Sequence, residues 1–76
     1  MSLIKEIEEC IREAHRQVSI AIGIVIRNRE NYRPNTTKRL WWDTLYYSLK
    51  NIEAAITSSK VLIDHMKSKF SSRKRE

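Results

Sequence analysis

The sequence predicts an all-α protein in which two long helices fold back on each other as an antiparallel hairpin. Two rows of residues, almost all apolar, recur at alternating spacings of three and four. Such spacing is typical of helices that pack lengthwise against other helices. The chain contains one glycine and one proline, too few for the many turns of a β-rich fold. Its 76 residues form one domain at most.

The first helix is expected over about residues 2–30, with Ser2 as its N-cap. Its apolar row consists of Ile4, Ile7, Ile11, Ala14, Val18, Ala21 and Val25. A turn over about residues 31–36 follows, because Pro34 disfavours helical geometry at the residue before it.

The second helix is expected over about residues 37–70, followed by a basic tail over residues 71–76. Its apolar row consists of Trp42, Leu45, Leu49, Ile52, Ile56, Ser59, Ile63, Met66 and Phe70, in which only Ser59 is not apolar. A short connection places consecutive helices side by side and antiparallel. Residues 1–76 are therefore expected to form a single helical-hairpin domain.

The stretch from Val18 to Ile26 leaves an alternative open, because its β-branched residues alternate as they do in a strand. A strand here would need a partner strand from another subunit. We favour a helix, which would be apolar on nearly every side, so one neighbouring helix cannot cover it. The sequence thus predicts a homodimer that forms an elongated four-helix bundle, parallel or antiparallel. The predicted dimer interface consists of Ile20, Ile22, Gly23, Ile24 and Ile26.

The excess positive charge of the chain, whose net charge is +6, lies in the turn region and in the C-terminal tail. All aromatic residues except Phe70 lie between Tyr32 and Tyr47. Cations attract polyanions, and aromatic rings stack on unpaired bases or anchor protein interfaces. The predicted residues for binding a protein partner or a nucleic acid are Arg27, Arg29, Tyr32, Arg33, Lys38, Arg39, Trp41, Tyr47, Arg73, Lys74 and Arg75.

No catalytic motif or phosphate-binding glycine loop is visible in the sequence. His15, His65 and the lone Cys10 lack the ligand spacing of a zinc site. We therefore expect a non-enzymatic protein with no cofactor, no metal and no small-molecule substrate. A single cysteine forms no internal disulfide, and no signal peptide is recognised, so the expected compartment is the cytoplasm.

The predicted function is that of an interaction or adaptor module, a dimeric bundle that binds a macromolecular partner. The alternative is a regulator that binds RNA or DNA through the basic and aromatic turn region and the basic tail. Binding to a membrane surface is the least favoured hypothesis, since the apolar residues are used within the bundle.

Overall fold

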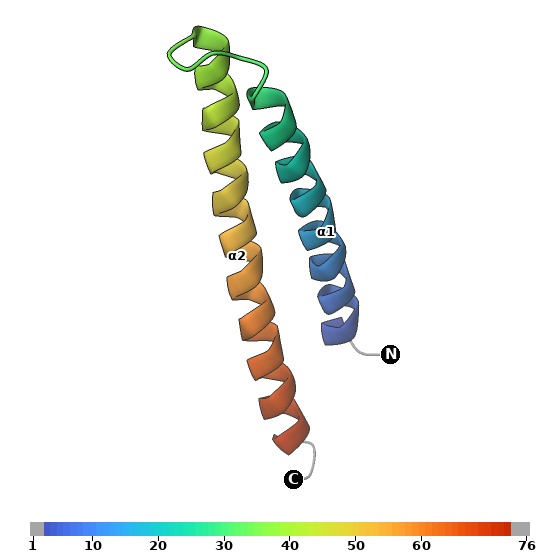
Figure 1. The fold of residues 1–76 in the computed structure, drawn as a ribbon. Helices are drawn as coiled ribbons and strands as arrows, with labels where there is room; N and C mark the ends of the chain where they lie inside the picture. Colours follow the sequence, from blue (N-terminus) through green and yellow to red (C-terminus); the bar gives the residue numbers. More distant parts are fainter. Residues whose placement is uncertain (1–2, 74–76) are drawn as a thin grey trace.

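The computed structural model describes residues 3–73, with side chains described for residues 3–69, and it contains two helices (Figure 1). Helix α1 spans Leu3–Arg29 and helix α2 spans Thr37–Arg73. The helices run antiparallel and form a rod of 61 × 18 × 12 Å, with both chain ends opposite the turn. The predicted all-α hairpin is confirmed, and α2 is longer than predicted. Ser2, Lys74 and Arg75 lie outside the described residues, as does the side chain of Arg73.

Helix α1 includes the whole stretch from Val18 to Ile26, so the alternative of a strand is wrong. The charges at its two ends suit a helix, with Glu6 in the first turn and Arg27 and Arg29 in the last turn. A lone strand would have left its backbone groups unpaired, whereas a helix satisfies them within the segment.

The core of the hairpin is thin. Among the described residues, Ile22, Val25 and Ile63 are the buried ones, and no side chain is completely enclosed. The chain exposes 6329 Å², whereas a compact monomer of 9.1 kDa exposes about 4,900 Å². The hairpin thus exposes about 1,400 Å² more than a compact monomer of its mass.

The line of residues along which the helices pack differs from the apolar rows seen in the sequence. Along α1 it consists of Ile4, Glu8, Ile11, His15, Val18, Ile22, Val25 and Arg29, all buried or half-buried. Along α2 it consists of Trp42, Tyr46, Leu49, Glu53, Ile56, Lys60, Ile63 and Lys67, in which the two lysines are exposed. Among the members whose side chains are described, every second one of each predicted row therefore lies on the packing line, and the members between them lie beside it.

Those remaining members lie on one side of the hairpin, which we call the open face. Each stands one position before a member of the packing line, about 100° round the helix axis. Because the helices are antiparallel, this step turns the side chains of both helices toward the same side. The open face consists of these members, together with Leu3, Cys10 and Ile24 of α1, which stand at the same kind of position; its full list is Leu3, Ile7, Cys10, Ala14, Ala21 and Ile24 of α1 and Leu45, Ile52, Ser59 and Met66 of α2. Trp41, Ser48, Ala55 and Leu62 of α2 also stand one position before the packing line and border this face. Ile7 is 51% exposed and Ile52 is 47% exposed.

The opposite side of the hairpin is polar and carries the ion pairs that join the two helices. Lys67 Nζ lies 2.9 Å from Glu8 Oε2, and Arg29 Nη1 lies 3.1 Å from Asp43 Oδ1. One side of the hairpin is thus closed by charged groups, while the other presents apolar side chains that no described residue covers.

Candidate functional site

The turn is held by a small set of local hydrogen bonds. The backbone N–H of Tyr32 donates to the carbonyl of Arg29 at 3.2 Å. Asn35 has a φ of 69°, in the left-handed region that asparagine tolerates better than most residues. The Thr36 hydroxyl accepts the N–H of Arg39 at 3.2 Å and donates to the carbonyl of Arg33 at 2.8 Å. Thr36 is therefore the N-cap of α2 and fixes how the chain enters that helix.

Asp43 gathers two of the predicted binding arginines. Its Oδ1 accepts hydrogen bonds from Arg29 Nη1 at 3.1 Å and from Arg39 Nε at 3.2 Å. Arg39 also donates to the carbonyl of Tyr32 at 2.9 Å, and the Arg29 guanidinium lies 4.5 Å from the centre of the Tyr46 ring. Both arginine side chains are about three-quarters buried. Through these contacts, the two arginines link α1, the turn and α2.

The other predicted cations of the turn region stay accessible. Arg27, Arg33 and Lys38 are exposed. The Lys38 ammonium lies 6.0 Å from the centre of the Tyr32 ring, at the outer limit of a cation–π contact. These three side chains form the accessible positive charge at this end of the rod.

The aromatic residues divide between the hairpin and the surface. Tyr32 stacks on Trp42 with ring centres 6.5 Å apart, and both are half-buried. Trp41 is 71% exposed and Tyr47 is 64% exposed, so both face away from α1. Exposed tryptophan and tyrosine side chains of this kind often supply the energy of an interface. The structure thus brings Trp41 and Tyr47 to the surface and places Tyr32 in the packing of the turn.

The predicted dimer interface is also divided. Ile22 is buried within the hairpin, Ile24 lies on the open face, and Ile20 and Ile26 are exposed elsewhere on α1. A Cβ on Gly23 would meet Arg27 Nη1 at 3.8 Å, which is ordinary contact, so the hairpin itself does not require a glycine there.

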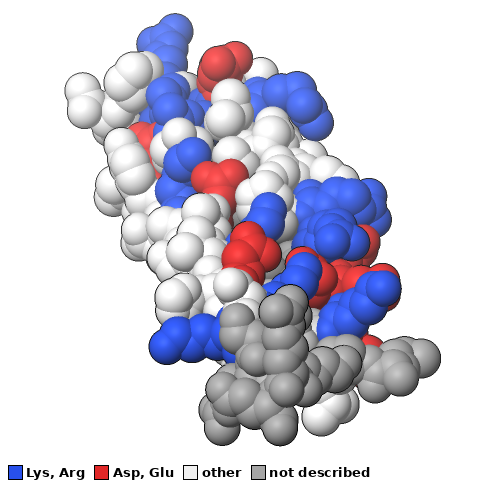
Figure 2. Space-filling model, turned by 90° about the horizontal axis from the view of Figure 1, so that it is seen from below, with Lys and Arg blue, Asp and Glu red and all other residues white. Residues whose placement is uncertain are grey.

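Sequence reasoning missed a continuous strip of uncharged residues along the outer side of α2. We call it the outer strip; it consists of Leu40, Trp41, Thr44, Tyr47, Ser48, Asn51, Ala54, Ala55, Ser58, Val61 and Leu62, all exposed. It is about 33 Å long at 1.5 Å per residue. Figure 2 looks along the rod and shows charged side chains gathered over α1 and between the helices, with the α2 margin largely uncharged. The sequence could have revealed this strip, because uncharged residues recur there at the spacing of one helix face.

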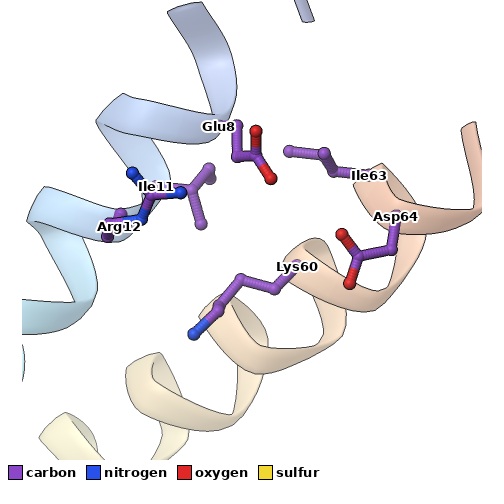
Figure 3. A pocket seen from close by; sticks show the side chains of 6 residues that line it. All are labelled: Glu8, Ile11, Arg12, Lys60, Ile63 and Asp64. Carbon is purple, nitrogen blue, oxygen red and sulfur yellow. The ribbon is translucent and has the colours of Figure 1, made fainter. Parts of the chain in front are cut away.

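A hollow of about 50 Å³ lies between the helices on the polar side (Figure 3). Three residues of each helix line it, namely Glu8, Ile11, Arg12, Lys60, Ile63 and Asp64. The hydrogen bond from Lys67 is the main cause that lowers the pKa of the Glu8 carboxyl below its ordinary value of 4.5. The hollow has room for a few water molecules only, so it offers no space for a substrate.

Metal ligands are not gathered in the described part of the chain. No group of three or more His, Cys, Asp or Glu residues there is arranged to hold a metal ion. His15 is half-buried along the packing line, whereas His65 and Cys10 are exposed.

No helix among the described residues is long and apolar enough to cross a bilayer. Comparison with protein-family models, curated proteins and solved structures finds no match for this chain.

Proposed function

We propose that this protein is a non-enzymatic interaction module that works as a homodimer, in which two hairpins form an elongated four-helix bundle that binds a macromolecular partner. The open face is the observation that carries the proposal. The apolar side chains of each helix point partly toward the neighbouring helix and partly toward the open face. In a four-helix bundle, the interior lies in the direction between these two.

A second copy of this chain is the occupant that suits the open face. The excess exposed area of about 1,400 Å² per chain is of the size that stable dimers bury. A two-fold axis brings two identical faces together and closes the assembly at two chains. Either a parallel or an antiparallel arrangement of the hairpins would cover both faces. The single cysteine fits a reducing compartment such as the cytoplasm.

Sedimentation equilibrium of the wild-type chain and two matched variants tests the dimer. Ile52→Glu places a charge on the open face, whereas Thr57→Glu places the same charge on an exposed site outside the open face and the outer strip. We expect a helical wild-type dimer, a dimeric Thr57→Glu variant, and an Ile52→Glu variant that dissociates and loses helicity. A wild-type monomer that is fully helical by circular dichroism would overturn the proposal.

Nucleic-acid binding is the second candidate function, favoured by the exposed cations Arg27, Arg33 and Lys38 and by the exposed Trp41 ring, all at the turn end of the rod. Cations on phosphates and bases on aromatic rings together support binding to single strands. The test is a titration with single-stranded RNA, single-stranded DNA and duplex DNA at two salt concentrations.

Binding that depends on these cations must weaken steeply with salt and must be lost when all three are replaced by glutamine. The matched control replaces Arg12, Arg16 and Lys50, in the middle of the rod, by glutamine. If both triple variants lose the same affinity for nucleic acid, the binding depends on net charge alone. If the wild-type chain binds no nucleic acid at low salt, nucleic-acid binding is excluded as its function.

A further inference from the structure

The open faces of two hairpins can meet in two ways, which differ in the helices that face each other. A two-fold axis along the rod places both turns at one end and packs each α1 against α2 of the partner. A two-fold axis across the rod places the turns at opposite ends and packs α1 against α1 and α2 against α2. The sizes of the side chains on the open face distinguish the two arrangements.

The contacts between the helices determine which residues of α1 and α2 lie at the same height along the rod. Glu8 pairs with Lys67 near one end, and Arg29 pairs with Asp43 near the other. The two helices run in opposite directions and rise equally, by about 1.5 Å per residue (Figure 1), so the heights between these pairs follow. Residues at equal height include Cys10 and Leu62, Ala21 and Ile52, and Ile24 and Ser48.

A two-fold axis along the rod leaves every height unchanged, so each residue on the open face of α1 meets the residue of the partner's α2 at its own height. A small side chain then meets a large one at three heights, where Cys10 meets the partner's Leu62, Ala21 meets the partner's Ile52, and Ile24 meets the partner's Ser48. At another height both side chains are small, namely Ala14 and the partner's Ser59. Alternation of large and small side chains across a contact is what fills the core of a bundle.

A two-fold axis across the rod matches the side chains less well. When the centres of both faces are aligned, large side chains meet large ones and small side chains meet small ones. The pairs would be Ile7 with Ile24, Ile52 with Leu62, Cys10 with Ala21, and Ala55 with Ser59 of the partner subunit. Such a contact is crowded at some heights and leaves gaps at others, and both defects reduce stability. The packing therefore favours the axis along the rod.

The axis along the rod brings the turn regions of both chains, residues 27–43, to one end. Each turn region contains five Lys or Arg residues and two Asp or Glu residues, a net charge of +3. Arg27, Arg33 and Lys38 are exposed, and so is the acidic Glu30. Packed helices lie 8–10 Å apart, so the two turn regions are about 10 Å from each other. One elongated anion can therefore contact cations of both chains.

Repulsion between the two turn regions is modest, because salt at about 0.15 M largely screens charges more than about 8 Å apart. A bound polyanion removes the repulsion that remains. The exposed Trp41 ring stands at the same end of the rod, beyond the end of α1, so no helix of the partner covers it. Cations beside an exposed aromatic ring suit a single-stranded nucleic acid, whose bases stack on such rings, whereas an acidic peptide has no bases to stack.

We infer that two copies of the chain pair with their turns at the same end, each α1 against α2 of the partner, and that the two turn regions form one binding site for a single-stranded nucleic acid. Half of the cations in this site come from each chain, so the site is incomplete in a monomer. The inference rests on the proposed homodimer and specifies both its arrangement and its ligand.

Spin labels on single cysteines test the arrangement, in a chain whose Cys10 is replaced by serine. Labels on Thr37→Cys, at the turn end, should lie within about 35 Å of each other in the dimer, because packed helix axes are only 8–10 Å apart. Turns at opposite ends would separate these labels by about the 61 Å length of the rod. Thr57→Cys, near the middle of the rod, is the matched control and should give a short distance in either arrangement.

Titration with oligothymidine of about 15 nucleotides tests the site. Calorimetry should give one strand per dimer. The logarithm of the affinity should fall with the logarithm of the salt concentration with a slope of about −4, as expected for six phosphate contacts of a single strand, rather than about −2 for three.

The outcomes separate the inference from the proposed dimer. A Thr37 distance near the length of the rod would overturn the arrangement. One strand per chain, with the shallower slope, would show that each turn region binds alone, and no binding at low salt would overturn the site. Polyglutamate that binds as tightly as the strand would assign this end to an acidic protein instead. A Thr57 control that shows no distance between chains would overturn the dimer itself.

Discussion

Arg29 of α1 and Asp43 of α2 are joined by a hydrogen-bonded ion pair of 3.1 Å that links the end of one helix to the second turn of the other. Asp43 also binds Arg39 at 3.2 Å, so a single carboxylate pairs with two arginines of the turn region and offsets one of their two positive charges. The accessible positive charge there is therefore smaller than the sequence suggests.

Replacing Asp43 by asparagine should destabilise the hairpin, because both ion pairs are lost while the arginines stay half-buried. We expect a loss of about 1 kcal/mol, measured as the urea midpoint at fixed protein concentration. The same variant removes one negative charge beside two arginines, so RNA binding should strengthen if the turn contacts phosphates. An unchanged urea midpoint would show that Asp43 does not tie the helices together.

Thr36→Ala should remove the N-cap of α2, because its hydroxyl accepts the N–H of Arg39. The expected cost is about 1 kcal/mol, which lowers the melting temperature by about 4–8 °C for a domain of this size. Thr37→Ala is the matched control, since Thr37 is the first residue of the helix. Equal melting temperatures for the two variants would contradict the assignment of the cap.

The adjacent tryptophans should behave differently, because Trp42 stacks on Tyr32 whereas Trp41 faces solvent. Trp42→Ala should cost about 2 kcal/mol, less than for a fully buried ring. Trp41→Ala should change stability by less than about 0.5 kcal/mol. Urea unfolding measures both, and a larger cost for Trp41→Ala would mean that another chain covers the strip at that end.

Gly23→Ala should stabilise the protein by about 0.5–1 kcal/mol, because alanine is the better helix former. The structure offers room, since the nearest contact of an added Cβ is the end of the Arg27 side chain at 3.8 Å. Thermal unfolding at two protein concentrations provides the readout. Destabilisation that grows on dilution would place Gly23 in close contact with a second chain and would move the dimer interface off the open face.

Acidification should remove the contribution of the Glu8–Lys67 pair. The folded pKa of Glu8 lies below its ordinary value of 4.5. The stabilisation is therefore present above about pH 4.5 and is lost as the pH falls through the lowered folded value. Comparing the wild type with Glu8→Gln from pH 3 to pH 7 should show a stability difference that vanishes at the acidic end. A difference that is constant over this range would contradict the pairing.

The fold class followed from local features that a single sequence displays. Apolar periodicity and Pro34 sufficed to place two helices and a turn, because helix formation and the break before proline depend on neighbours a few residues apart. The basic and aromatic turn was also visible, since its residues are close in the sequence. The partner of Arg29 was not visible, because it depends on how α1 and α2 meet, whereas Arg39 and Asp43 stand at the i,i+4 spacing of an ordinary pair within one helix.

The sequence by itself determined that this chain forms two amphipathic helices joined by a short turn. Only the tertiary structure decided how far each helix is rotated about its axis. The apolar rows are wide enough for several rotations, and the one adopted puts charged residues such as Glu8 and Arg29 on one side, where they pair with α2. That rotation leaves Ile7 and Ile52 on the open face and the strip from Leu40 to Leu62 on the outside. Ion pairs between the helices favour this rotation because they require particular side chains to face each other, whereas apolar contacts are not directional.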